Sequence, residues 1–492
     1  MNDFEHNNII ICVNKMVDME RQILSTKNKA LTLNLNPAIY GTLAEIGGGQ
    51  EVARAFFQAG GASGTVAKSI SAYDKTFSDY LYNNKKSGRY VSEKRLVKML
   101  SIEYNELIST LQHESISGTR FFVFADTVVT LNFAKDNDAH GWLGVRFQLR
   151  PDSEPNEVVL HVSLLENDTL LQQYTLGALG INLIYACYHF PDRPNVFLQS
   201  LMDNLDNHRV EINMVRMSGK DLQYVDNRLL GVQLVKNGMT SATIFDNKGN
   251  VMQPSDMLYK KNLLAFRGSF RPITNVGFDM LQKCYAIFQK DEDYRQENTL
   301  ALCEITLNNL MHEGVFDESD FLERVNLLNG LGQNVMISNF REYYKLVGYF
   351  SKFKLGKLRV VIGIPTFINV WDKKYYTNLR GGILEAFGKL FTENMKLYVY
   401  PSLNKNNGKL FTSKDIKLSG DLIHLYNYLC ENKKIIDVKS AEKKWLHIDS
   451  GKTLGMIQKN IKGWEALVPE YVASYIKNNK IFGYTGKQGI NY

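Results

Sequence analysis

The chain has 492 residues, of which 44% are hydrophobic and 22% charged, with a formal net charge of +7 at pH 7. These are the values of an ordinary globular protein, and they exclude a disordered chain, a fibrous repeat and a disulfide scaffold. At about 150 residues per domain, the length predicts two or three domains.

The cysteines and the N-terminus indicate the compartment. The five cysteines are scattered and form no CxxC pair, which is typical of reduced thiols in a reducing compartment. No apolar run approaches the roughly 18 residues of a transmembrane helix. Residues 1–6 carry acidic side chains where a secretory signal carries basic ones. The sequence therefore predicts a cytoplasmic protein with no membrane partner.

Residues 1–118 are expected to form a mainly helical N-terminal part. A Gly/Ala-rich region at residues 41–71 favours close packing between helices, because small residues let two backbones approach. The helix-compatible stretches are residues 9–33, 51–57 and 91–111.

Residues 119–401 alternate between short apolar runs, rich in β-branched or aromatic residues, and helical stretches. The expected strands are residues 121–125, 158–165, 209–217, 242–245, 263–266, 302–307, 334–338, 358–364 and 396–400. The expected helices are residues 171–189, 225–236, 276–288, 341–350 and 382–393, with Asp226 capping the second and Gly238 ending it. This alternation predicts an α/β domain with a central, mostly parallel sheet, which is either doubly wound or barrel-like.

Residues 402–492 are expected to form a Lys-rich, helical C-terminal part. Residues 401–492 hold 15 lysines, no arginine and 8 acidic residues, while the rest of the chain has 43 basic and 43 acidic residues. A basic segment favours polyanions, but arginine is the usual reader of phosphates and guanine. Nucleic acid is therefore not an expected partner.

Several motifs that suggest chemistry are incomplete. Lys68-Ser69 and Lys452-Thr453 resemble the end of a phosphate loop, but the first lacks both required glycines and the second lacks the leading one. Asp136, Asp138 and His140 form either a cation site or a polar hairpin tip, and no HExxH motif occurs. We therefore expect no metal site.

Two aspartates, Asp126 and Asp246, each follow an expected strand. That is where α/β proteins place functional groups, although capping of a loop explains either residue equally well.

The sharpest local pattern is Gly-Ser-Phe-Arg-Pro-Ile-Thr-Asn at residues 268–275, between an expected strand and an expected helix. It resembles the Gly-Ser-Phe-Asp-Pro-x-Thr-x-Gly-His signature of the Rossmann-like nucleotidylyltransferases, including the nicotinate-mononucleotide and pantetheine-phosphate adenylyltransferases. The chain departs from that signature at three positions: Arg271 replaces Asp, Val276 replaces Gly, and Gly277 replaces the catalytic His.

This resemblance implies a turn that presents backbone amides and a helix N-terminus to nucleotide phosphates. The implied nucleotide-binding residues are Gly268, Ser269, Phe270, Arg271, Thr274 and Asn275. Ser338 and Arg341 partly match the Ser-Ser/Thr-x-Arg motif of the same family and are the second candidate phosphate contact. Arg271 either adds a phosphate donor or pairs with a neighbouring acid such as Asp279.

Several segments along the chain also resemble a family of bacterial proteins. Those segments are residues 40–47, 140–144, 225–229, 259–261, 337–339 and 396–401. Members carry the label of nicotinate- or nicotinamide-mononucleotide adenylyltransferase or of TonB-dependent receptor. The helix-alternating strands and the acidic N-terminus disfavour the receptor label.

Two function classes remain open. The first is a nucleotide-binding protein that resembles a mononucleotide adenylyltransferase, active or inactive, with a mononucleotide or ATP with Mg²⁺ as its ligand. The second is a non-catalytic protein that assembles into homo-oligomers or acts as a scaffold. The lost histidine favours the second class and the retained turn favours the first.

Overall fold

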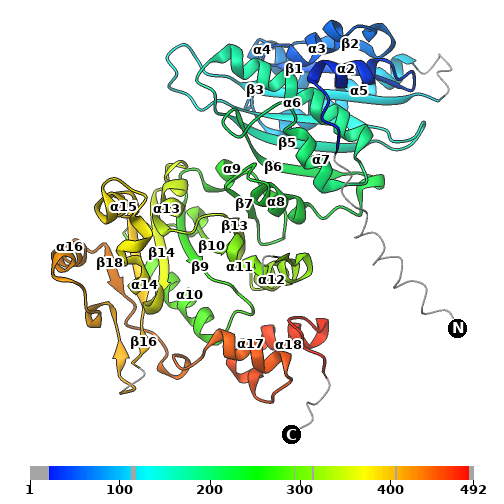
Figure 1. Cartoon of the computed structure of the whole chain (residues 1–492). Helices are drawn as coiled ribbons and strands as arrows, with labels where there is room; N and C mark the ends of the chain where they lie inside the picture. Colours follow the sequence, from blue (N-terminus) through cyan, green and yellow to red (C-terminus); the bar gives the residue numbers. More distant parts are fainter. Residues whose placement is uncertain (1–20, 112–117, 293, 313–314, 405–406, 487–492) are drawn as a thin grey trace, which may run out of the picture. The chain divides into compact units, whose positions relative to one another are not determined.

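The computed structural model describes residues 21–111, 118–292, 294–312, 315–404 and 407–486, shown in Figure 1. The chain divides into two compact units. The first comprises Met1–Val158, Leu164–Val210 and Gly219–Asp221, and the second comprises Val159–Ser163, Glu211–Ser218 and Leu222–Tyr492. The sequence indicated three parts instead, with boundaries after residues 118 and 401. Within the described ranges, no helix combines the length and apolar character needed to cross a membrane.

The first sheet has six strands in the order β2-β1-β3-β4-β5-β6. β1 to β4 belong to the first unit, whereas Val159–Ser163 of β5 and Glu211–Ser218 of β6 are assigned to the second. The strands are β1 Ile39–Ile46, β2 Val66–Ile70, β3 Arg120–Val129, β4 His140–Phe147, β5 Asn156–Leu164 and β6 Val210–Ser218. β1 pairs in parallel with both β2 and β3, whereas β3 pairs antiparallel with β4. The sheet is therefore mixed.

The expectation of a mainly helical N-terminal part is wrong for β1 and β2. Every residue of β1 except Tyr40 is buried, so this strand shows no alternation of apolar and polar residues. Its small residues serve strand pairing: a Cβ at Gly41 would lie 2.3 Å from the carbonyl oxygen of Phe122 on β3. The small residues at the start of the Gly/Ala-rich region therefore reflect the close pairing of β1 with β3, and not the packing of two helices.

The helices of the first unit are α2 Thr26–Asn34, α3 Glu51–Ala59, α4 Lys75–Tyr82, α5 Glu93–Leu111, α6 Thr169–His189 and α7 Pro194–Leu201. They confirm the expected helices at residues 51–57, 91–111 and 171–189. α2 lies at the end of the helix expected at residues 9–33, and the part before residue 21 lies outside the described residues. α6 packs closely on α3, because a Cβ at Gly180 would lie 2.3 Å from Val52 Cγ2.

The second unit holds an eight-stranded sheet with the order β18-β15-β14-β9-β10-β13-β7-β8. The strands are β7 Ala242–Phe245, β8 Val251–Met252, β9 Asn262–Arg267, β10 Thr299–Thr306, β13 Asn334–Ser338, β14 Lys357–Gly363, β15 Met395–Tyr400 and β18 Ile435–Asp437. All neighbours from β18 to β13 are parallel, and β7 and β8 add an antiparallel edge.

The α/β class is confirmed, but the expected single central sheet is wrong. The strands expected at residues 158–165 and 209–217 belong to the first sheet, as β5 and β6. The mostly parallel sheet begins later, at β7, and has two separate edges at β18 and β8 instead of closing as a barrel. The C-terminal part is not only helical, since β18 adds a sixth parallel strand beside β15.

The helices of the second unit are α8 Asn227–Lys236, α9 Pro254–Leu258, α10 Asn275–Phe288, α11 Leu307–Leu310, α12 Glu318–Gly330, α13 Tyr343–Ser351, α14 Ile364–Val370, α15 Gly382–Leu390, α16 Gly420–Glu431, α17 Ser450–Gln458 and α18 Glu470–Asn479. Two short ribbons accompany them, β11 Met311–His312 with β12 Val315–Phe316, and β16 Ser402–Leu403 with β17 Leu410–Phe411. Asp226 caps α8 as expected, and Gly238 follows it at φ +69°.

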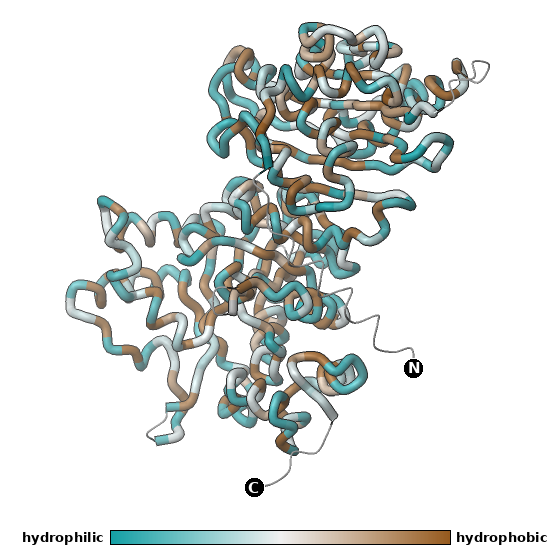
Figure 2. The backbone as a smooth tube through the Cα atoms, turned by 45° about the vertical axis from the view of Figure 1, so that its right-hand side comes forward, coloured by the Kyte–Doolittle hydropathy of each residue, from teal (hydrophilic) through white to brown (hydrophobic). Residues whose placement is uncertain are grey.

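The core of the second unit lies between the sheet and its helices. Fully buried residues include Val360 and Leu397 from the strands and Phe350 and Phe367 from α13 and α14. In Figure 2, hydrophobic residues are frequent along the inner stretches of the backbone, and many residues of the outer loops are hydrophilic. The sheet thus provides a rigid frame for the turns at its carboxyl edge.

Candidate nucleotide-binding site

The turn at residues 268–274 leads from the carboxyl end of β9 into α10. The amide of Gly268 donates to the carbonyl oxygen of Glu304 on β10 at 3.0 Å. Phe270 is buried, with its ring edge-to-face on Phe266 at a centroid distance of 5.2 Å. A Cβ at Gly268 would lie 3.1 Å from the Phe270 ring, so the glycine lets the turn close around its own aromatic side chain.

The first turn of α10 has backbone N–H groups that no capping side chain binds. Thr274 is the N-cap residue, and its side chain makes no capping hydrogen bond. The first amides of a helix have no partner within it and carry the positive end of the helix dipole. α10 has 14 residues, enough for a full dipole at this end. The arrangement suits an anion.

Arg271 pairs with an acid on α12, and not with Asp279 on α10. Its Nε lies 2.5 Å from Oδ1 of Asp320, on α12. Asp279 instead accepts hydrogen bonds from the Tyr400 hydroxyl and from the amide of Glu442. Arg271 keeps a quarter of its side chain exposed, at 25%, and can still meet a ligand in solution.

A second arginine, Arg324, reinforces the turn. It forms an ion pair with Asp320, and its Nη1 donates to the carbonyl oxygen of Ser269 at 3.1 Å and to that of Asn309 at 2.7 Å. The Asp320 carboxylate therefore forms ion pairs with the guanidinium groups of both Arg271 and Arg324. Burial lowers the pKa of Arg324, whereas the Asp320 charge raises it.

A buried ion pair joins the ends of β9, β10 and β13. Arg267 Nε and Nη2 donate to the two carboxylate oxygens of Glu304, at 2.7 and 2.8 Å. Ser338 Oγ donates to Glu304 Oε1 at 2.5 Å. The Arg267 guanidinium also lies over the ring of Tyr343, 4.4 Å from its centroid. This fork geometry fixes the three strand ends relative to one another.

The structure brings the expected site residues to one edge of the sheet, in different roles. Residues 268–275 form the turn and the helix start, and Ser269 is exposed. Ser338 is buried and bound to Glu304. Arg341 contributes its backbone carbonyl, which accepts from Arg267 Nη1 at 3.0 Å, while its side chain is exposed. Asn275 Nδ2 donates to the carbonyl oxygen of Ala466 at 2.9 Å.

Sequence reasoning missed Arg267, Glu304, Asp320 and Arg324. A signal existed for Glu304, because an acid inside the apolar run Leu-Cys-Glu-Ile needs a buried partner. Arg267 directly follows its strand and was a candidate for that partner. Asp320 and Arg324 carry no such signal, since their spacing is that of any exposed helical ion pair.

The residues at the turn offer Mg²⁺ no open carboxylate. Glu304 is bound by Arg267 and Ser338, and Asp320 by Arg271 and Arg324. Across the described residues, no group of three or more His, Cys, Asp or Glu side chains could hold a metal ion.

The other expected motifs have structural roles. Lys68 lies in β2 and pairs with Glu103 at 2.6 Å, so it belongs to no phosphate loop. Asp136 accepts from Asn132 within the loop between β3 and β4. Asp246 accepts from the amides of Lys248 and Asn250 and closes the turn between β7 and β8.

The first unit holds a buried carboxylate pair on two adjacent parallel strands, near the carboxyl end of β1. Glu45 on β1 and Asp126 on β3 are register partners, exposed by only 2% and 1%. Glu45 accepts from the amides of Val52 and Ala53 at the start of α3, and Asp126 accepts from the amide of Ile46. Burial raises the pKa of Glu45 to about 7. Burial, and then the Glu45 charge, raise the pKa of Asp126 well above its usual range.

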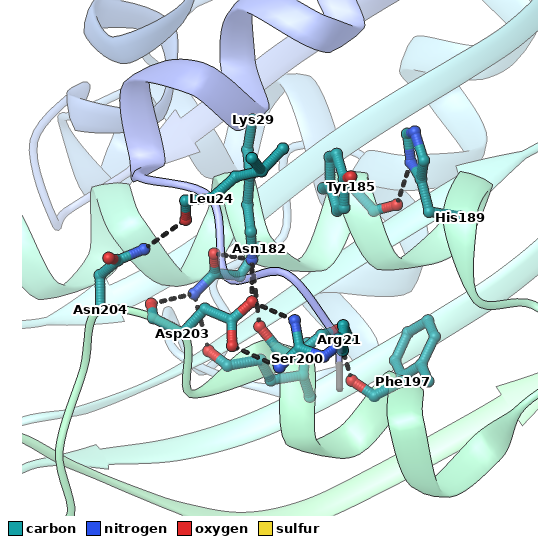
Figure 3. A network of polar contacts seen from close by, with 11 residues as sticks. Arg21, Leu24, Lys29, Asn182, Tyr185, His189, Phe197, Ser200, Asp203 and Asn204 are labelled. Atoms are coloured by element: carbon teal, nitrogen blue, oxygen red, sulfur yellow. Dashed lines mark hydrogen bonds and ion pairs between the residues drawn. The ribbon is translucent and has the colours of Figure 1, made fainter. Parts of the chain in front are cut away.

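A buried lysine, Lys29, stabilises the start of the described chain (Figure 3). Its Nζ donates to Asp203 Oδ2 at 2.6 Å and to Asn182 Oδ1 at 2.7 Å. Arg21 donates to both oxygens of Asp203, at 2.5 Å each. Burial lowers the pKa of Lys29, and the Asp203 carboxylate opposes that shift. Because these groups bind one another, the network anchors α2 to α6 and to the turn after α7.

Comparisons with known proteins give a weak, partial α/β likeness. No protein-family model matches the sequence, and no curated protein matches it. Matching solved structures include the competence/damage inducible protein CihA from Agrobacterium tumefaciens (13% identity, TM-score 0.24, 34% of this chain and 98% of that one). A competence or damage-inducible protein from Enterobacter asburiae matches at 10% identity and a TM-score of 0.24, covering 33% of this chain and 95% of that one. A competence-damaged protein (CinA) superfamily protein from Escherichia coli matches at 16% identity and a TM-score of 0.23, covering 34% and 90%. Likeness at this level carries no conclusion about activity.

Proposed function

We propose that the second unit binds a nucleotide through the turn at residues 268–275. The observation that carries this proposal is the place of the turn in the strand order. If β9, β10, β13, β14, β15 and β18 are numbered 1 to 6, their order in the sheet is 6-5-4-1-2-3. That is the order of a doubly wound dinucleotide-binding sheet, in which ligands bind where the order reverses.

The reversal lies at the carboxyl ends of β9 and β14. The chain passes from β9 to β10 on one side, and from β13 it crosses back to β14 on the other side. The turn follows β9, the first strand of the series, as the phosphate-binding turn does in such sheets. The sequence resemblance to the nucleotidylyltransferase signature covers the same residues. Fold position and sequence therefore support one site.

The chemistry of the turn suits a phosphate group. The first amides of α10 supply donors, Ser269 is exposed within the turn, and Arg271 adds a partly exposed guanidinium. Charge-assisted hydrogen bonds of this kind are about twice as strong as neutral ones. A mononucleotide or ATP presents the matching group.

The turn supports binding better than transfer. Gly277 stands where the resembled signature has its catalytic histidine, so no side chain there can stabilise charge that develops on the transferred phosphate. An interaction missing only from the transition state lowers the rate of transfer and leaves binding intact. We therefore propose a nucleotide-binding protein with little or no adenylyl transfer.

The test is binding to the purified full-length chain. Titration calorimetry with Mg·ATP, and separately with nicotinate mononucleotide, should give a saturable signal for at least one of the two. At about 100 times its dissociation constant, the ligand should stabilise the fold by roughly 2.7 kcal/mol in a thermal unfolding assay. No heat of binding and no thermal shift with either ligand would refute the proposal.

A further inference from the structure

We propose that the C-terminal segment, defined as residues 449–485, competes with nucleotide for the start of α10. This inference rests on the proposed function. The contact behind it is the hydrogen bond from Asn275 Nδ2 to the carbonyl oxygen of Ala466, at 2.9 Å. Asn275 is the first residue of α10, and Ala466 lies in the short 3₁₀ helix Trp464–Leu467 of the C-terminal segment.

The C-terminal segment has a small core of its own. Trp464, Ile457, Val472 and Ile476 are all buried, and they come from α17, α18 and the 3₁₀ helix between them. Lys477 lies over the Trp464 ring at 5.7 Å and pairs with Glu465 at 2.8 Å. The 3₁₀ helix that meets Asn275 is therefore held in place by the segment around it.

The segment also docks on α12, the helix that carries the acid partner of Arg271. A Cβ at Gly330 would lie 1.8 Å from the Tyr471 hydroxyl, so α18 packs directly on the end of α12. The amide of Phe482 lies 3.5 Å from Glu323 Oε2, also on α12. The docked segment thus touches both helices that frame the turn.

The group that contacts Asn275 is a hydrogen-bond acceptor, the Ala466 carbonyl oxygen. A phosphate oxygen is also an acceptor, so the two groups would compete for the same position. The Ala466 carbonyl presents its negative end to the first residue of α10, next to the amides proposed to bind phosphate. A phosphate oxygen brought to the same place is repelled by that carbonyl and seeks the same donor. Binding a nucleotide therefore favours release of the 3₁₀ helix, and release favours the nucleotide by the same factor.

The first experiment is hydrogen–deuterium exchange of the full-length wild-type chain with and without saturating Mg·ATP or nicotinate mononucleotide. Competition predicts slower exchange in peptides that cover residues 268–288 and faster exchange in peptides that cover residues 464–484. Slower exchange at the turn with unchanged or slower exchange at residues 464–484 would overturn the competition while leaving the proposed function in place. No change at the turn, together with no calorimetric signal, would overturn both.

The second experiment uses Trp464→Ala, which removes the buried centre of the segment without altering the turn. Loss of one competing hydrogen bond should tighten nucleotide binding by about 2- to 12-fold in calorimetry. Tyr428→Ala is the matched control, because this aromatic residue is 61% exposed on α16. Equal affinity in Trp464→Ala and wild type would contradict the proposal. If Trp464→Ala does not fold, the wild-type exchange result alone decides.

Discussion

Arg271 and Asp320 form an ion pair that links the turn after β9 to α12, with Nε 2.5 Å from Oδ1. Arg271 stands where the resembled signature has an aspartate. The acid that pairs with it, Asp320, comes from α12. Because Asp320 also pairs with Arg324, its single carboxylate meets two guanidinium groups. The cluster of these three residues keeps a positive charge next to the proposed phosphate position.

Arg271→Ala should weaken nucleotide binding by roughly 10- to 150-fold, because a hydrogen bond to a charged group contributes about 1.5–3 kcal/mol. The fold should tolerate the change, since Arg324 still pairs with Asp320. Calorimetry with Mg·ATP measures the effect. Arg295→Ala is the matched control, because Arg295 is exposed and precedes the amino end of β10, at the opposite edge of the sheet from the turn. Equal losses in the two variants would show that general charge, and not a contact by Arg271, attracts the ligand.

Gly277→His should raise pyrophosphate release above that of the wild type. The glycine has room for a side chain, since the nearest atom to a Cβ there would be Ile273 Cγ1 at 3.4 Å. A positioned acid or base contributes about 10²- to 10⁴-fold. The assay measures pyrophosphate released from Mg·ATP in the presence of nicotinate mononucleotide, with Gly277→Ala as the control. Strong release by the wild type would show that the chain transfers adenylyl groups without this histidine.

Much of the α/β fold could be predicted from the sequence, because its strands are short apolar runs between helices with clear caps. Asp226 caps α8, and residues 171–189 form a long helix, as expected. Strand order could not be predicted, because parallel strands that are apolar throughout look alike whatever their neighbours. The division into two sheets depends on that order. β18 was missed because three residues carry too little periodicity to recognise.

The site could be predicted in its local part only. The turn and the helix start lie together in sequence, so the signature placed Gly268 and Thr274 correctly at a strand-to-helix turn. The Arg271–Asp320 pair joins residues almost fifty positions apart, and only the packing of α12 against the turn brings them together. The contact between Asn275 and Ala466 spans 191 positions. Such pairs carry no periodic signal.

Lys29→Met should destabilise the first unit by about 3 kcal/mol, because Asp203 is buried and would lose one of its two cations. Arg21 would still pair with Asp203, which keeps the loss at the lower end of the range for a broken buried pair. Urea unfolding gives the change in the free energy of unfolding. Lys27→Met, at an exposed position of the same helix, should change it by less than about 0.5 kcal/mol. Equal effects would show that the buried network is not what stabilises α2.

The stability of the first unit should fall as the pH rises from 5 to 8. Burial raises the folded-state pKa of Glu45 to about 7, so the folded chain holds a proton that the unfolded chain releases near pH 4.5. For a raised carboxyl pKa, the stabilisation is complete below the unfolded value and is lost as the pH rises through the folded value. Asp126 shifts in the same direction and adds to the effect.

The slope is limited to about 1.4 kcal/mol per pH unit for each proton. Urea midpoints measured at pH 5, 6, 7 and 8 should therefore decrease, and Glu45→Gln should flatten the curve, since an uncharged amide has no proton to lose there. Glu106→Gln is the control, because that carboxylate is more than half exposed, at 56%. A wild-type curve that rises over this range would mean that both carboxylates are ionised in the folded protein, held by the amides at the start of α3.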